Sequence, residues 1–232
     1  MNLRYLFSGN RDHITLMAIL CLLCMNAYGD ENMKVYSFNA RPFKFGIRLP
    51  LKESRDFPLA PVIGNVDIEN DKVYDSGSSI TLLEKYWDYH DGLFQSNVGT
   101  LAGKVRLRRL PKSYRADIRN IDCLIDLIDS QLKESFSISN EEKIRAGLVG
   151  QVVKLPSEYA KTDINGINGV RYQLGGSYDF VAYVMPLSSE FYVQIQFSFI
   201  DNSHGGKTDW RLVAGKNADL YAATFFIDQQ NM

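Results

Sequence analysis

The segment Phe191–Ile200, FYVQIQFSFI, constrains the fold more than any other part of the chain. Aromatic and aliphatic residues alternate with polar ones, so an extended strand here has one apolar face and one polar face. The apolar segment Phe180–Met185 precedes it, and only the turn-like Pro186–Glu190 lies between the two. This arrangement predicts a hairpin in an antiparallel sheet with one face on the core and one polar face.

Other segments also have the composition of strands, and turn residues separate them. In Leu101–Leu110, Val105 and Leu107 alternate with Arg106 and Arg108, which suits a strand with one wet face. The aromatic-rich segment 84–94 fits neither pattern clearly. The remaining predicted strands are residues 35–38, 43–49, 62–68, 72–74 paired with 79–83 through a turn, 143–155 and 170–174.

Two segments have helical periodicity. Ala116–Phe136 repeats apolar residues at intervals of three and four, and Ser137–Asn140 is expected to end that helix. A second helix is predicted over Trp210–Phe225, with four apolar residues facing the sheet: Leu212, Val213, Leu220 and Ala223. The order of elements predicts an α+β fold, an antiparallel sheet packed with one long central helix and a C-terminal helix.

The C-terminal strand, turn and helix, Tyr192–Ile227, end in Ala-Ala-Thr-Phe-Phe-Ile. This region resembles the PsbP-like fold of photosystem extrinsic subunits and DcrB-like periplasmic proteins. The resemblance implies an α+β sandwich. It carries over no catalytic residue, because no motif with functional residues is matched.

Residues 14–25, ITLMAILCLLCM, form an apolar run preceded by Arg4 and Arg11 and followed by Ala27-Tyr28-Gly29. A basic region, a short apolar region and small residues before a cleavage point are typical of a secretory signal peptide. The run is shorter than the roughly 20 residues that a membrane-spanning helix needs. We therefore expect residues 1–29 to be a signal peptide and residues 30–232 to form a single exported domain without stable membrane insertion. A retained membrane anchor is the alternative.

Cysteine content indicates the compartment of the exported domain, and net charge indicates which classes of partner are disfavoured. Cys21 and Cys24 lie in the expected signal peptide, so only Cys123 remains and the mature monomer can form no internal disulfide. There is no Asn-x-Ser/Thr glycosylation site, and both absences favour a bacterial periplasm. The formal net charge of −1 becomes −2 when two arginines and one aspartate leave with the signal peptide. This balance argues against nucleic acid as a partner.

Few residues have the pattern of a catalytic or metal site. Asp75-Ser76-Gly77-Ser78-Ser79 resembles the active-site loop of pepsin-like aspartic proteases, with Leu148-Val149-Gly150 as the later apolar element, but no second copy occurs. These proteases need two aspartates, so a hydrolase would have to be a homodimer, and a β-turn is the other interpretation. His90 and His204 lack second ligands at metal-binding spacing. We expect no cofactor, no metal and no enzymatic activity.

Two groups of residues are candidates for binding another protein. One is aromatic and polar, Trp87, Asp88, Tyr89 and His90, a composition that is common at interfaces. The other is an acidic stripe on the long helix, Asp122, Asp126 and Asp129. Core packing and a solvated helix face are the respective alternatives. We expect a periplasmic protein that acts by protein–protein binding, such as an immunity protein against a periplasm-targeted toxin; a small-ligand or lipid carrier and an aspartic-type hydrolase using Asp75 are the alternatives.

Overall fold

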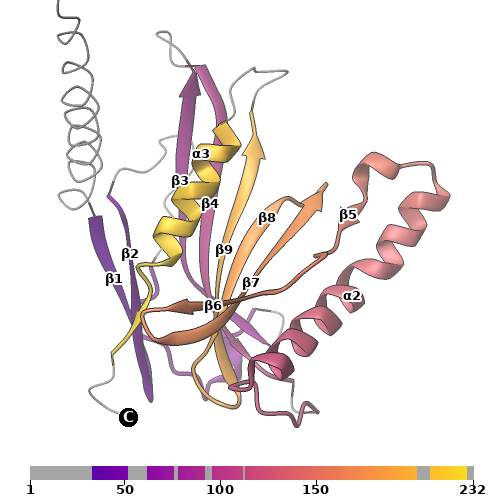
Figure 1. The fold of residues 1–232 in the computed structure, drawn as a ribbon. Coiled ribbons are helices and arrows are strands. Elements are labelled where there is room, and N and C mark those ends of the chain that lie inside the picture. The colour runs from indigo at the N-terminus through magenta and orange to yellow at the C-terminus, as the bar shows by residue number, and fades with distance from the viewer. Residues whose placement is uncertain are drawn as a thin grey trace, which may run out of the picture.

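The computed structural model describes residues 33–51, 62–75, 78–91, 96–111, 113–202 and 210–228. The expected signal peptide and His204 lie outside these residues. The chain forms a seven-stranded antiparallel sheet, in which strands follow the order β3-β4-β9-β8-β7-β5 and β6 pairs with β7, and a three-stranded sheet in the order β1-β2-β10 (Figure 1). The strands are β1 Met33–Ala40, β2 Phe43–Pro50, β3 Ser79–Asp91, β4 Ser96–Arg109, β5 Val153–Lys154, β6 Ala160–Ile164, β7 Ile167–Gly176, β8 Phe180–Pro186, β9 Phe191–Asp201 and β10 Phe226–Ile227.

The two helices lie on opposite faces of the large sheet. Helix α3, Trp210–Ala222, and the small sheet pack on one face, and helix α2, Ile121–Arg145, packs on the other face near β7 (Figure 1). This arrangement confirms the predicted α+β class with one long helix and one C-terminal helix. In the described part of the chain, no helix is both long and apolar enough to span a membrane.

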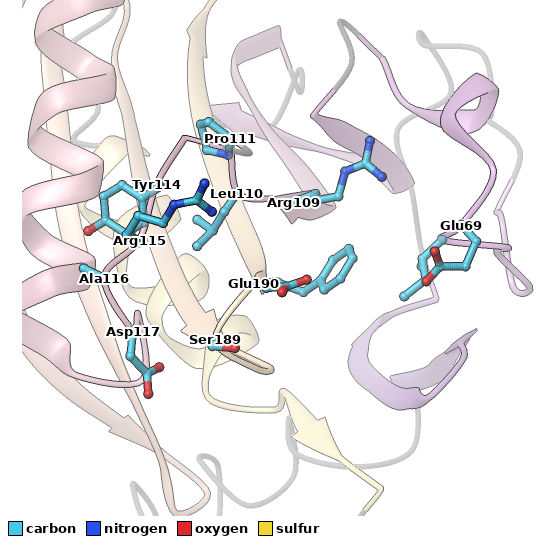
Figure 2. Close-up of a pocket in the computed structure, with 12 residues that line it drawn as sticks. Glu69, Arg109, Leu110, Pro111, Tyr114, Arg115, Ala116, Asp117, Ser189 and Glu190 are labelled. Atoms are coloured by element: carbon cyan, nitrogen blue, oxygen red, sulfur yellow. The ribbon is translucent and has the colours of Figure 1, made fainter.

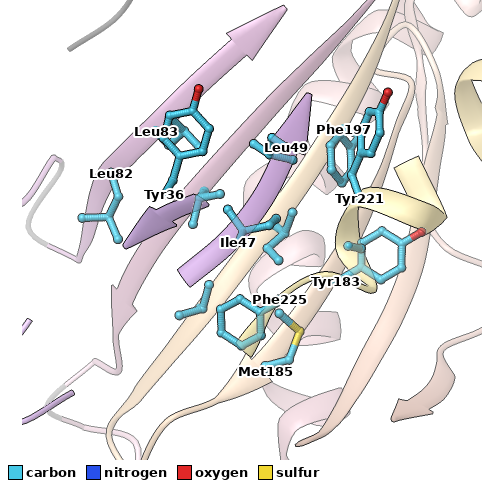
Figure 3. Packing of buried hydrophobic residues seen from close by; sticks show 14 of the residues in the cluster. Tyr36, Ile47, Leu49, Leu82, Leu83, Tyr183, Met185, Phe197, Tyr221 and Phe225 are labelled. Carbon is cyan, nitrogen blue, oxygen red and sulfur yellow. The ribbon is translucent and has the colours of Figure 1, made fainter. Parts of the chain in front are cut away.

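The main core lies between the large sheet, the small sheet and α3. Ile47 from β2, Phe197 from β9 and Phe225 after α3 are almost completely buried there (Figure 3). The predicted alternation in β9 is correct for this face, since Val193, Ile195 and Phe197 all contribute to it. The opposite face differs from the prediction, because Gln194 and Gln196 are buried as well.

The long helix begins and ends later than predicted. The Asn120 side chain accepts a hydrogen bond from the Asp122 backbone N–H and caps the helix start. The helix then continues through Ser137–Asn140, which was expected to end it, as far as Arg145. Gly147 follows with a φ of +74°, a conformation that favours glycine. The predicted strand 143–155 is therefore wrong: it contains the helix end, a 3-10 turn at Val149–Gln151 (η2) and the short β5.

The sequence correctly places a helix at α3 but assigns it the wrong buried face. Leu212, Val213, Leu220 and Ala223, which were expected to face the sheet, are exposed. The buried residues are instead Trp210, Ala214, Ala218, Tyr221 and Ala222. Small alanines allow the helix backbone to approach the sheet closely, and this outweighs the greater hydrophobicity of the leucines.

Three smaller predictions also change. Residues 62–68 form no strand, only a bridge between Asn65 and Asn39. The segment 84–94, which was ambiguous, lies in β3 as far as Asp91. Residues 161–169, which lie between the strands expected at 143–155 and 170–174, contain most of β6, the start of β7 and a tight turn with positive φ at Asn165 and Gly166, the signature of an Asn-Gly hairpin.

Candidate functional site

A wide hollow lies at one end of the large sheet. Its volume is about 640 Å³, within the range of binding pockets. Four segments meet there: the 62–75 segment, the end of β4, the connection from β4 to α2, and the turn between β8 and β9. Figure 2 shows Glu190 between the Tyr114–Asp117 side of the hollow and the side that carries Glu69. We call this hollow the end groove.

Backbone pairing brings the parts of the end groove together. Arg109 of β4 is directly opposite Phe191 of β9 in the antiparallel ladder. The Leu110 N–H then donates to the Glu190 carbonyl at 2.8 Å, which ties the chain after β4 to the β8–β9 turn. In that turn the Ser188 hydroxyl accepts hydrogen bonds from the N–H groups of Glu190 and Phe191. These bonds hold Glu190 at the groove.

The floor of the end groove is apolar. Ile68, Leu110 and Phe191 are 3%, 8% and 8% exposed and belong to the cores below it. Tyr114 is held in place because its hydroxyl donates to the Cys123 carbonyl at 2.7 Å. Cys123 itself is partly exposed rather than fully buried. The floor of the groove is therefore preformed, and its three apolar side chains each expose less than a tenth of their surface.

The rim of the end groove is charged, and part of it is already paired. Arg109 donates to Asp71 at 2.7 Å and lies 4.3 Å from the centre of the Tyr74 ring. The hydrogen bond to Asp71 raises the pKa of Arg109, so this side chain is a permanent cation. Asp117 pairs with Arg119 at 2.6 Å. These pairs fix two sides of the rim.

Three other rim charges, Glu69, Arg115 and Glu190, are exposed. Within the described residues none of them forms an ion pair. The end groove thus has exposed charges of both signs around side chains that belong to the cores.

A second hollow, about 300 Å³, lies between α3 and strands β7 and β8. Its two arginines are paired internally. Arg171 donates to Asp219 at 3.1 Å, and Arg211 pairs with Asp179. Tyr183 also donates to Asp219. This hollow therefore offers fewer unpaired charges than the end groove.

The aromatic candidates of β3 are mostly turned into the core. Trp87 is 7% exposed, and its ring lies 5.1 Å from that of Tyr221. Tyr89 packs on Trp210 and accepts a hydrogen bond from Asn217. The Trp87 ring is therefore not available to a partner. Its position agrees with core packing, the alternative interpretation of this aromatic group.

The polar candidates of β3 lie elsewhere. Asp88 is on the opposite face and accepts a hydrogen bond from Thr100 at 2.7 Å, while His90 is exposed near the end of the strand. Asp75, at the other end, closes a backbone turn onto Ser79, and its carboxylate accepts a hydrogen bond from Thr81. That geometry agrees with the β-turn interpretation of Asp75–Ser79.

The acidic stripe of α2 is largely neutralised by lysines. Asp122 pairs with Lys161 at 2.7 Å, and Asp129 pairs with Lys133 at 2.6 Å. Asp126 is exposed. Because β3 is an edge strand of the large sheet and α2 packs on β7 near the other edge, the two candidate groups do not form one surface (Figure 1).

The residues of the end groove were not recognised as a site from the sequence. Sequence pattern indicates only a turn at Pro186–Glu190 and gives no sign of a role for Arg109 or Arg115. The available signal is that charged residues occur in the two connections that follow long predicted strands. That signal becomes informative only when the pairing of β4 with β9 is known.

No family model matches this chain, and neither a curated protein nor a solved structure is significantly similar to it. The resemblance to PsbP-like and DcrB-like proteins therefore stays a prediction. Within the described residues, no group of three or more His, Cys, Asp or Glu side chains is placed to hold a metal ion.

Proposed function

We propose that this chain is an exported, non-enzymatic protein of the bacterial periplasm that acts by binding another protein through the end groove. The observation that carries the proposal is the combination of an apolar floor with three rim charges, Glu69, Arg115 and Glu190, that have no ion partner among the described residues. Unpaired charges of both signs favour a partner whose surface carries the complementary pattern.

Site-specific photocrosslinking tests the proposed surface. A photoreactive phenylalanine at position 115 or 190 is expected to capture one partner of the same mass in cells. The same group at Glu134, which is exposed on α2 and does not line the groove, is expected to capture none. Equal capture from all three positions, or no capture from 115 and 190, would overturn the proposal.

A charge-reversal pair tests the rim. Arg115→Glu is expected to weaken binding of the captured partner about tenfold, which corresponds to about 1.4 kcal/mol. Arg145→Glu makes the same change on an exposed residue at the far end of α2 and is expected to leave binding unchanged. If both variants bind as the wild type does, the rim charges have no role. Native mass spectrometry that finds only a small ligand would favour the carrier alternative.

Export is tested separately. N-terminal sequencing of the protein recovered from the periplasmic fraction is expected to begin at Asp30. A protein that keeps residues 1–29 in the membrane fraction would instead support the retained anchor. The immunity form of the proposal predicts that cells survive export of the partner only when they also produce this chain.

A further inference from the structure

The face of the large sheet beneath α2 has two halves of different character. Near β7 and β8 it carries apolar residues that pack on the helix, such as Val170, Val184 and Leu174. On β4 and β9 the same face carries polar residues in register: Arg106 is opposite Gln194, and Lys104 is opposite Gln196. The polar half meets the apolar half below α2.

Of the two arginines of the polar half, Arg106 interacts with the charge of Glu84, whereas Arg108 has no acidic partner among the described residues. Arg106 donates to Gln196 at 3.2 Å, and Arg108 donates to Gln194 at 2.9 Å. The acid of the neighbouring row, Glu84, pairs with Lys104 at 2.8 Å. A partly buried guanidinium bonded only to neutral groups retains an uncompensated charge.

A cavity of about 60 Å³ lies where Arg108 meets α2. It is lined by Arg108, Ile128, Gln131, Leu132, Ser135, Tyr172, Val184, Tyr192 and Gln194. The Nε atom of Arg108 is buried and has no hydrogen-bond acceptor. A buried guanidinium N–H without an acceptor is costly, so this atom requires an explanation.

Two other groups that line this cavity have donors to spare, while the Ser135 and Tyr192 hydroxyls use their own protons in bonds to Gln131. The Tyr172 hydroxyl accepts a bond from Gln194 at 3.1 Å, which leaves its own proton to donate. Burial raises the pKa of Tyr172, so the hydroxyl stays protonated. The Gln131 carbonyl oxygen accepts from Tyr192 at 3.1 Å, which leaves the Gln131 amide N–H groups for another acceptor. No carboxylate lines the cavity.

We propose that this cavity is a binding site for a small oxyanion, a carboxylate or phosphate group held by Arg108, Tyr172 and Gln131. Arginine is the side chain best suited to such groups, because its planar N–H donors match two oxygens at once. A water molecule occupies about 30 Å³ of liquid, so a cavity of about 60 Å³ has the volume of about two water molecules and limits the ligand to a group of very few non-hydrogen atoms. The site is separate from the end groove, so either can fail without the other.

The Arg108 Nε–H signal in a nitrogen–proton NMR spectrum reports directly on this site. Titration with sodium acetate or sodium phosphate, at constant ionic strength against sodium chloride, is expected to move that signal saturably. The Arg171 Nε–H, already bonded to Asp219 in the other hollow, is the internal control and is expected to stay in place. A response to acetate alone identifies a carboxylate site, and a response to phosphate alone identifies a phosphoryl site.

Two matched tyrosine variants test the donors. Tyr172→Phe keeps the ring and removes one donor, and is expected to weaken anion binding roughly fivefold. Tyr159→Phe removes a hydroxyl that bonds to Asp129 outside the cavity, and is expected to leave binding unchanged. The proposal is overturned if neither anion moves the Arg108 signal saturably, if Arg171 responds equally, or if both variants bind as the wild type does. These results do not depend on an Arg108 variant that could fail to fold.

Discussion

Replacing Gly99 by alanine is expected to destabilise the protein because of one ring on α3. Gly99 lies in β4, and a Cβ atom there would lie 2.2, 2.3 and 2.5 Å from three atoms of the Trp210 indole. Ordinary contact starts at 3.4 Å, so the ring would have to move by more than 1 Å. Trp210 is 7% exposed and packs between the rings of Tyr89 and Phe199, so it has little room to move.

The expected cost follows from overpacking. Inserting a methyl group into a packed core costs about 1–3 kcal/mol. Alanine also restricts the unfolded chain, which returns about 0.4–1 kcal/mol where the backbone accepts it. We therefore expect Gly99→Ala to lower the free energy of unfolding by about 1–2 kcal/mol. Gly150→Ala is the control, because a Cβ there meets nothing within 4 Å, and its effect should stay within about 0.5 kcal/mol.

Urea unfolding followed by tryptophan fluorescence measures this cost, since the chain has two tryptophans and both are buried. A double-mutant cycle with Trp210→Leu identifies the cause. The double variant should lose at least about 1 kcal/mol less unfolding free energy than the two single losses added together. The reasoning fails if Gly99→Ala and Gly150→Ala have the same stability, or if the two substitutions at the contact are additive.

Three further outcomes are expected, each measured by urea unfolding. Ala218→Leu, on the buried face of α3, should cost about 1–3 kcal/mol, whereas Leu212→Lys on the exposed face should change stability by less than about 0.5 kcal/mol; the reverse order would mean that the other face is buried. Burial alone would raise the pKa of Glu84, but hydrogen bonds, first that from Lys104, lower it below its usual value. Ionised Glu84 therefore stabilises the fold at pH values above its unfolded pKa of about 4.3. This contribution is lost as the pH falls through the folded pKa. Glu84→Gln should therefore cost about 1 kcal/mol at pH 7 and flatten the loss of stability between about pH 5 and 3; equal slopes would contradict this. Asn140→Ala should cost about 1–2 kcal/mol, because its side chain both donates to and accepts from the backbone of β5 at 2.8 and 2.9 Å; no loss would mean that these bonds contribute nothing.

Local patterns predicted the strands of the large sheet because the alternation is strong. Phe191–Ile200 and Phe180–Met185 became β9 and β8 with nearly the predicted bounds. The same reasoning chose the wrong face of α3, because it ranked residues by hydrophobicity alone. The buried face of α3 is set by its packing on the sheet, where Trp210 lies directly over Gly99 of β4, and that contact joins positions more than 100 residues apart in sequence.

The polar face of the large sheet is more buried than the alternation of polar and apolar residues predicts. Arg106 and Arg108 alternate with apolar neighbours, and this pattern predicted a wet face. In the fold, Gln194 and Gln196 on that face are 3% and 4% exposed: the arginines bond to both, and Gln194 also lies beside α2. Alternation distinguishes polar from apolar faces but does not show which polar face another element will cover.

The end groove depends even more strongly on pairing between distant segments. Its rim charges lie in connections, where local sequence favours turns and places few limits on side chains. Only the register that sets Arg109 opposite Phe191, 82 positions later in the chain, brings Arg115 and Glu190 to one hollow. A one-residue shift in this register would turn the face of β9 that now packs on the core toward α2, so the buried alternation of β9 also fixes the position of the rim. Stability of the core and geometry of the proposed binding surface are thus set by the same ladder, and substitutions that disturb the β4–β9 pairing should impair both together.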